Sequence, residues 1–326
     1  MKRPELPEAE KFGALGPRLT AGVERQLHNR GFAVCPSFLP QAQVAAMRDA
    51  VARLHPPYED LVQQFGIPVP PAEALPNGRS VAFPYPEAVL NQSVMDGEVI
   101  EFSKRWFDTD DIVFHPGGTL VRYPRIDERG EVMGGGHAEP DDLHIDNFSL
   151  LPPTADRHYH QLFFWFYMED LVPEQGPTRF WPTEVTADGL VSNFDNVEQA
   201  GPTPVGDRFE EGLPAGSLVI FTSATIHGRN AYMLKTGQRY IIKHTWGRAD
   251  HTFEGQGTYV PGMGNPQLNE LVRSLTPRER EYFHYPPVGD PYYTDATLEK
   301  LELAYPGWNA SGEYAAAAVA AKGARL

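Results

Sequence analysis

The residues best suited to chemistry lie in a short segment, Asp142-Leu143-His144-Ile145-Asp146. In a β-strand, residues two apart point to the same face, so His144 and Asp146 can bind one metal ion together. A third ligand must come from elsewhere, and His227 is the best candidate because it closely follows the apolar run 217–222. Two histidines and one carboxylate on one face of an octahedron leave three positions open, which is the ligand set of non-heme Fe(II) oxygenases.

A second histidine pair competes for the same role. His158 and His160 also stand two residues apart, in the polar segment 154–160 before an apolar run. Two imidazoles on one face can bind a metal, but this segment has no suitably spaced carboxylate. We therefore favour His144 and Asp146, and read His158 and His160 as loop or pocket lining.

Arg239 indicates what the open metal positions would hold. It begins the run Arg239-Tyr240-Ile241-Ile242-Lys243, and a buried guanidinium at the start of a core strand needs an anionic partner. A 2-oxoglutarate that chelates the metal through its keto-acid end would present its far carboxylate to this guanidinium as a bidentate pair. A structural Asp or Glu is the alternative partner.

Elements of two kinds must position these residues. Thr20 and Gly31 bracket a short helical pattern, and the apolar residues of 40–54 recur at helical spacing. Residues 56–95 are rich in Pro and Gly, which predicts long loops and one short helix. Further on, runs rich in β-branched and aromatic residues predict strands at 112–123, 161–168, 178–181, 217–222 and 240–246.

These runs predict the fold class. Strands spread over the middle of the chain, with helical patterns before and after them, indicate a mainly β protein with flanking helices and a double-stranded β-helix core, the jelly-roll or cupin-like architecture. We expect one domain over 1–326, made of N-terminal helices and loops (1–111), the β core (112–250) and a C-terminal helical extension (251–326). The capping box Thr276-Pro277-Arg278-Glu279 predicts a helix start within that extension.

In this order the motifs resemble the phytanoyl-CoA dioxygenase family of Fe(II)/2-oxoglutarate-dependent oxygenases. The resemblance covers roughly residues 20 to 246 and rests on the ordered motifs. They are Gly31-Phe32-Ala33-Val34, His144-x-Asp146, Gly176-Pro177-Thr178-Arg179-Phe180-Trp181-Pro182, Gly216-Ser217-Leu218-Val219-Ile220-Phe221, His227 and Arg239.

The resemblance adds further expectations. It implies that Thr178 contacts 2-oxoglutarate, since Arg229 stands where many relatives have a serine that does so. Pro182-Thr183-Glu184-Val185 replaces a loop motif common in the family, so the local substrate contacts differ. The ligand Asp146 is present, which disfavours the halogenase branch, where a small residue replaces it.

The aromatic run 163–167 predicts a strand buried on both faces, and Trp165 is the ring that we expect to line the substrate pocket. The expected activity is that of a non-heme Fe(II)/2-oxoglutarate-dependent dioxygenase. It would hydroxylate or otherwise oxidise an unactivated C–H bond of a small-molecule metabolite, with Fe(II), 2-oxoglutarate and O₂ as cofactors and cosubstrates, ascorbate as a stimulant, and succinate and CO₂ as coproducts. The alternatives are a cupin-like isomerase or hydrolase that does not use 2-oxoglutarate, and a catalytically silent β-sandwich binding protein.

Composition excludes several partners and sites. The net charge of −15, from 28 Lys+Arg and 43 Asp+Glu, disfavours nucleic acid and anionic lipid surfaces as partners. The sequence has one cysteine, Cys35, so an internal disulfide and a multi-cysteine metal site are excluded. With no apolar window of about 18 residues, we expect a cytoplasmic protein. It would be peroxisomal only in a eukaryote, from the C-terminal Ala324-Arg325-Leu326, and the C-terminal helices offer a homodimer contact.

Overall fold

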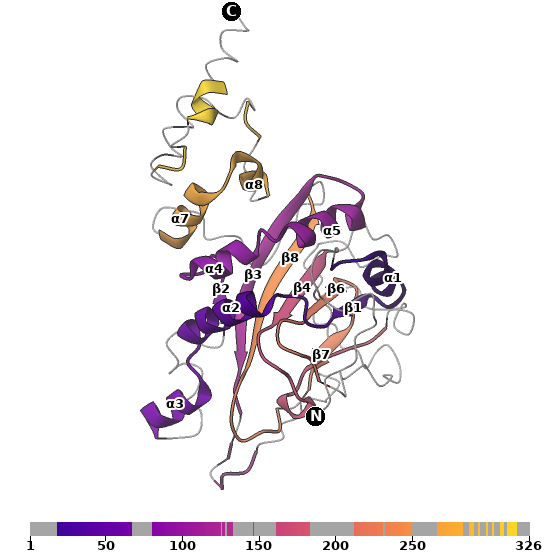
Figure 1. Cartoon of the computed structure of the whole chain (residues 1–326), viewed down its shortest axis with the longest axis vertical. Helices are drawn as coiled ribbons and strands as arrows, with labels where there is room; N and C mark the ends of the chain where they lie inside the picture. Colours follow the sequence, from indigo (N-terminus) through magenta and orange to yellow (C-terminus); the bar gives the residue numbers. More distant parts are fainter. Residues whose placement is uncertain are drawn as a thin grey trace, which may run out of the picture.

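The computed structural model (Figure 1) describes the β core and most of the helices that flank it. The described residues are 18–66, 80–124, 126–127, 129–132, 146, 161–182, 212–230, 232–249, 266–282, 287–289, 293, 298, 302, 307–309 and 312–317.

The N-terminal part follows the helix signals of the sequence. Helix α1 (Ala21–Arg30) starts where the Thr20 side chain accepts a hydrogen bond from the Gly22 N–H, and it ends at Gly31, which has a positive φ of 77°. Strand β1 (Phe32–Cys35) and helix α2 (Gln41–Leu54) follow. The predicted helical stripe of α2 is buried, as expected from its spacing.

The region 56–95 holds more regular structure than its Pro and Gly content predicted. It contains helix α3 (Tyr58–Phe65), the short strand β2 (Ser80–Ala82) and helix α4 (Ala88–Ser93). The expectation of long loops and one short helix was therefore wrong, because the region holds two helices and a strand. Pro57 stands directly before α3, where a missing N–H costs nothing, so this proline starts a helix instead of breaking it.

Helix α5 (Gly97–Phe107) was not predicted at all. Asp96 caps it, with its carboxylate accepting hydrogen bonds from the N–H groups of Glu98 and Val99. The helix leads into β3 (Ile112–Arg122), the longest strand of the molecule's described part. In Figure 1, α2, α4 and α5 lie across one face of the large sheet.

That sheet has six strands in the order β1-β6-β4-β8-β3-β2, and every neighbouring pair is antiparallel. Its four inner strands are β3 and the strands β6 (Leu218–Thr222), β4 (Leu162–Tyr167) and β8 (Arg239–Arg248). A second sheet pairs β5 (Thr178–Phe180) with β7 (His227–Arg229), also antiparallel. The short 3₁₀ helix Pro173–Gln175 leads into β5.

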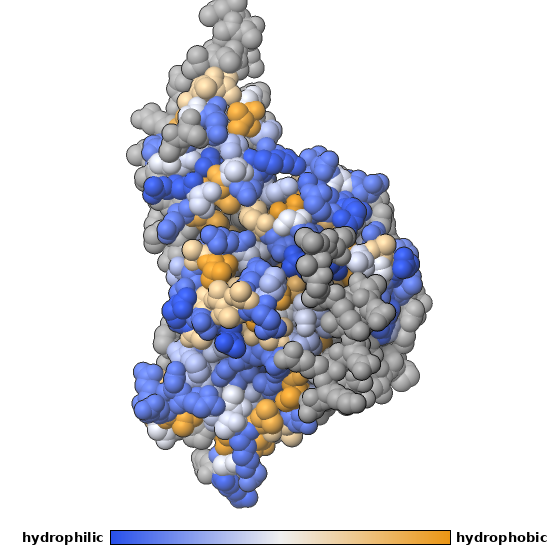
Figure 2. Space-filling model, viewed as in Figure 1, coloured by the Kyte–Doolittle hydropathy of each residue, from blue (hydrophilic) through white to orange (hydrophobic). Residues whose placement is uncertain are grey.

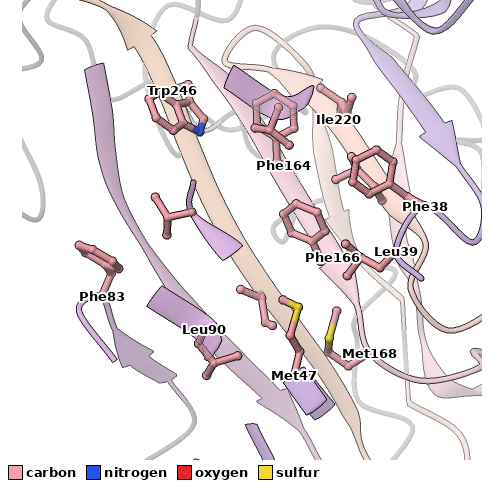
Figure 3. Packing of buried hydrophobic residues seen from close by; sticks show 14 of the residues in the cluster. Phe38, Leu39, Met47, Phe83, Leu90, Phe164, Phe166, Met168, Ile220 and Trp246 are labelled. Atoms are coloured by element: carbon pink, nitrogen blue, oxygen red, sulfur yellow. The ribbon is translucent and has the colours of Figure 1, made fainter. Parts of the chain in front are cut away.

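Alternate side chains of β4 divide the core in two. Phe164 and Phe166 join the cluster under the helices, which includes Met47 of α2 and Trp246 of β8 (Figure 3). Trp165 points to the opposite face, into a second cluster that also contains side chains of the small sheet. This is the period of two that a strand imposes, here with both faces buried.

The small sheet lies over this second face. The ring of Phe180 on β5 stacks on Phe32 at 5.3 Å between centroids and lies 5.1 Å from Phe221 of β6. The predicted mainly β fold, with two facing sheets in a jelly-roll core and helices outside it, is confirmed.

The C-terminal region joins the core through two described helices, α7 (Pro266–Ser274) and α8 (Pro277–Glu281). The predicted capping box at Thr276 is present, with Glu279 as the reciprocal partner. The backbone N–H of Phe114 donates to the carbonyl of Tyr282 at 2.9 Å, which ties the end of α8 to β3.

The surface of the described residues carries no large hydrophobic patch. Figure 2 shows hydrophobic residues scattered between hydrophilic ones on one face. The exposed large hydrophobic residues of the described ranges are Phe65, Met233 and Val288, from three separate segments. No helix within these ranges is both long and apolar enough to span a bilayer.

Candidate metal and cosubstrate site

The structure brings two of the three predicted metal ligands together. The Nε2 atom of His227 lies 3.5 Å from Oδ2 of Asp146. The His227 side chain is 2% exposed and that of Asp146 is 15% exposed, so the pair is buried but not sealed. His144, the third predicted ligand, lies outside the described residues, as do His158 and His160. Within the described ranges, no three His, Cys, Asp or Glu side chains lie close enough together to bind one metal ion.

Strand pairing and a backbone hydrogen bond orient His227. The residue opens β7, opposite Phe180 of β5. Its Nδ1 atom lies 3.1 Å from the carbonyl oxygen of Thr225, which can only accept a hydrogen bond. Nδ1 therefore carries the proton, and Nε2 presents its lone pair on the side of Asp146, as a metal ligand requires.

Aromatic rings hold the imidazole of His227 from three sides. The ring centroid of Phe221 lies 4.8 Å away, that of Trp165 lies 5.6 Å away edge-on, and that of Phe180 is stacked at 5.8 Å. Rings packed this closely limit rotation of the imidazole and keep water away from it. The structure thus places Trp165 beside a predicted metal ligand.

Arg239 lies on the same face of the large sheet. It is 2% exposed, and its Nη1 donates to the carbonyl of Gly176, the residue that ends the 3₁₀ helix before β5. In β8 it is the register partner of Arg122 on β3, so two guanidinium groups start from adjacent positions. The buried guanidinium of Arg239 favours an anionic partner in this part of the molecule.

Thr178 lies next to this cationic region, through a tyrosine that sequence reasoning missed. The hydroxyl of Tyr167 donates to Oγ1 of Thr178 at 3.3 Å, and both side chains are buried. Burial raises the pKa of Tyr167, while the nearby charge of Arg239 opposes that rise. Tyr167 stands two residues after Trp165 in β4, so strict alternation along the strand was the signal that could have identified it.

Lys243 is the second residue that sequence reasoning missed. It follows Arg239 by four residues in β8, which places both on the same face of the sheet. Burial lowers the pKa of the Lys243 ammonium; the carboxylate of Asp146 opposes this shift and Arg239 adds to it. Its signal in the sequence was a lysine directly after the apolar and aromatic run Tyr240-Ile241-Ile242.

The face therefore carries the Asp146–His227 pair at one place and the Arg239 guanidinium at another. Trp165 lies beside His227, and Lys243 interacts electrostatically with both Asp146 and Arg239. A carboxylate and a neutral imidazole suit Fe(II), Mn(II) and Zn(II). A buried guanidinium suits a carboxylate. The arrangement can thus bind a small molecule that chelates a metal at one end and carries a negative charge at the other.

Comparison with known proteins gives structural likeness only. No family model and no curated protein sequence matches the chain. Among solved structures, AviO1 from Streptomyces viridochromogenes Tue57 is similar at a TM-score of 0.50 and 14% identity, over 74% of this chain and 99% of AviO1.

Two further solved structures are similar at slightly lower scores. SnoK, a non-heme alpha ketoglutarate dependent carbocyclase from nogalamycin biosynthesis, has a TM-score of 0.49 and 19% identity, over 77% of this chain and 90% of SnoK. HygX from Streptomyces hygroscopicus, with iron bound, has a TM-score of 0.49 and 16% identity, over 76% of this chain and 95% of HygX. The fold is shared with AviO1, and the resemblance to the phytanoyl-CoA dioxygenase family stays a prediction.

Proposed function

We propose that this chain is a non-heme Fe(II)/2-oxoglutarate-dependent oxygenase that oxidises a small organic molecule. The observation that carries the proposal is the 3.5 Å approach of Asp146 Oδ2 to His227 Nε2 on the face of the sheet that also holds Arg239. Two atoms that each bind one ion at about 2.1 Å and at right angles are about 3 Å apart, so this pair fits a shared ion with little adjustment. His144 is proposed as the third ligand.

The donor set fits iron better than the hard cations. An imidazole and a carboxylate form part of the facial triad typical of non-heme Fe(II) enzymes, whereas Mg²⁺ and Ca²⁺ prefer oxygen ligands throughout. When bound, iron and 2-oxoglutarate supply the oxidising power through O₂, and the protein supplies binding, orientation and exclusion of water.

Each residue of the site has a definite part in this proposal. Asp146 and His227 hold the ion, and the Nδ1–H contact with Thr225 keeps the imidazole in the ligating tautomer. Arg239 binds the far carboxylate of 2-oxoglutarate through its planar pair of N–H donors. Thr178, hydrogen-bonded to Tyr167, adds a hydroxyl beside that carboxylate.

The aromatic side chains around His227 keep the reacting end dry. Phe221, Trp165 and Phe180 surround the imidazole and leave little space for bulk water. Exclusion of water protects a strongly oxidising site from side reactions. Hydroxylation of an unactivated C–H bond, with succinate and CO₂ as coproducts, is the proposed outcome, and ascorbate is proposed as a stimulant.

An anaerobic titration tests the proposal. Purified metal-free chain is loaded with Fe(II) and then titrated with 2-oxoglutarate, and the visible metal-to-ligand charge-transfer absorption is recorded. We expect one iron per chain and a saturable band. His227→Ala and Asp146→Ala should lose both iron and band, whereas His28→Ala and Asp49→Ala, which change exposed residues of α1 and α2, should keep them.

The outcomes separate the proposal from its rivals. If the chain binds a stoichiometric metal but 2-oxoglutarate gives no band and is not consumed, a cupin-like isomerase or hydrolase takes its place. If the chain binds no divalent metal at all, the proposed site is wrong and a binding protein is the better reading.

A further inference from the structure

Lys243 is a cation of this face that the proposed chemistry does not use. Its side chain is half-buried, and its Nζ lies 4.8 Å from the centroid of the Trp165 ring. Among the described residues, no carboxylate or carbonyl oxygen lies within hydrogen-bond distance of this Nζ. A buried ammonium on the face of a sheet is costly to leave without an anion.

Trp165 adds a second donor at the same place. Trp165 and Lys243 are direct register partners across β4 and β8, so their side chains leave the sheet next to each other. Trp165 is 6% exposed, and its indole Nε1 is buried with no hydrogen-bond partner in the described structure. Two adjacent donors, one of them charged, therefore lie side by side without a hydrogen-bond acceptor from the residues that the structure describes.

The balance of charge identifies the kind of acceptor. If the proposed function holds, Fe(II) contributes two positive charges and Asp146 one negative, while 2-oxoglutarate contributes two negative charges and Arg239 one positive. These groups sum to zero, and Lys243 remains as an extra cation on the same face. Among the described carboxylates, Asp146 interacts electrostatically with the Lys243 ammonium. Its negative charge would be balanced by the bound iron, so Lys243 would still lack a counter-charge.

We propose that Lys243 and Trp165 bind a carboxylate group of the primary substrate. The ammonium supplies the counter-charge for one carboxylate, and the indole N–H donates to one of its oxygens. A neutral group would leave the ammonium unbalanced, and a phosphate dianion would carry more charge than one ammonium offsets. The inference rests on the proposed function for its reaction, and it makes the primary substrate a carboxylic acid held beside the metal ligand His227, whose ring Trp165 touches.

Benzoate and benzamide are the probes, because they differ in charge but hardly in shape. The full chain, labelled with ¹⁵N at tryptophan and loaded with diamagnetic Zn(II) so that a metal engages Asp146, has five tryptophans and so at most five indole N–H signals in a two-dimensional NMR spectrum. Trp165→Phe identifies the signal of interest. We expect benzoate to move that signal downfield in a saturable manner, with benzamide at least tenfold weaker.

Substitutions separate this site from the cosubstrate site. Lys243→Met keeps the length of the side chain without its charge and should weaken benzoate binding at least tenfold, whereas Lys243→Arg should keep it within a few-fold. Lys235→Met is the matched control, since it removes an exposed lysine that pairs with Glu131 at 3.2 Å, and it should change nothing. Arg239→Lys should leave benzoate binding intact.

Three results would overturn the inference. The first is equal binding of benzoate and benzamide to the wild-type chain, and the second is unchanged benzoate binding in a folded Lys243→Met. The third is displacement of benzoate by 2-oxoglutarate in both wild type and Arg239→Lys, which would show that Lys243 binds the cosubstrate and not the primary substrate. The first comparison needs no variant, so a misfolded Lys243→Met leaves the test valid. Because no iron is present, the result does not depend on the charge-transfer titration that tests the proposed function.

Discussion

A buried histidine on the helix side of β8 makes the stability of this protein sensitive to acid. His244 is fully buried, and its ring lies 5.0 Å from that of Phe166. Its Nε2 is 3.3 Å from Oγ of Ser93, whose own hydrogen goes to the carbonyl of Leu90 at 2.7 Å. Nε2 must therefore carry the imidazole proton, and the buried Nδ1 has no acceptor among the described residues.

A second proton on this ring would be a buried charge without a partner. Burial accordingly lowers the pKa of His244 from 6.5 to about 3. The unfolded chain takes up this proton near pH 6.5, so between pH 6.5 and 3 it binds more protons than the folded chain, and folding stability falls as the pH falls. From the two pKa values, this residue alone costs about 2 kcal/mol at pH 5 and about 4 kcal/mol at pH 3, relative to neutral pH.

His244→Phe isolates this contribution. Phenylalanine keeps a ring in the site and cannot titrate, and Ser93 retains its bond to Leu90. Any packing cost is independent of pH, so it cancels when each protein is compared with itself. Urea unfolding at pH 7 and pH 5 should show that the wild type loses about 2 kcal/mol more than the variant over this interval.

The matched control is His28→Phe, which changes an exposed histidine of α1 and should follow the wild type. If His244→Phe and the wild type lose the same stability between pH 7 and pH 5, His244 is protonated in the folded protein, and the reasoning from its burial is refuted.

Three other predictions concern the cosubstrate and the sheet. Arg239→Lys should raise the apparent KM for 2-oxoglutarate about ten- to a hundredfold without loss of iron, because an ammonium keeps the charge but loses the paired donors. The measurement is a steady-state assay of succinate formation. Equal KM values for the variant and the wild type would contradict this prediction. Tyr167→Phe removes the hydroxyl that donates to Thr178 and should raise the same KM a few-fold. Urea unfolding should show that the free energy of unfolding falls by about 1 kcal/mol. An unchanged KM would show that Thr178 and Tyr167 do not belong to the cosubstrate site. Gly117→Ala should destabilise the fold by about 3 kcal/mol, since a Cβ there would lie 1.7 Å from the carbonyl oxygen of Lys243. Gly97→Ala is the control, because its Cβ meets nothing within 4 Å and the change should be neutral or slightly stabilising. Equal unfolding midpoints for the two variants would show that β3 can move away from Lys243.

Local signals in the sequence determined the elements that carry the site. The Thr20 cap, the Gly31 stop and the stripe of α2 are interactions between residues a few positions apart, so they are present in the sequence itself. The strand runs could also be recognised from the sequence, because both faces of β4 and β6 are buried and this requires long apolar stretches. Chemical type also made His227 and Arg239 stand out, since each follows or begins such a stretch.

Helix α5 and strand β7 could not be recognised from the sequence in this way. Strand β7 has three residues, too few for any period to appear, and it exists because Thr178 to Phe180 offer it a partner strand. Helix α5 has a cap and an amphipathic pattern, but its mixture of aromatic and charged residues does not separate it from a loop without the sheet that buries one side.

Tertiary structure alone decided which side chains meet. Asp146 and His227 come within 3.5 Å, although nothing in the order of the motifs states a distance. Tyr167 and Lys243 belong to the candidate site only because the registers of β4 and β8 place them on the face that also holds the predicted metal ligands, with Trp165 opposite Lys243. Register depends on the pairing of distant strands, and a shift of one residue would turn every one of these side chains to the opposite face of the sheet.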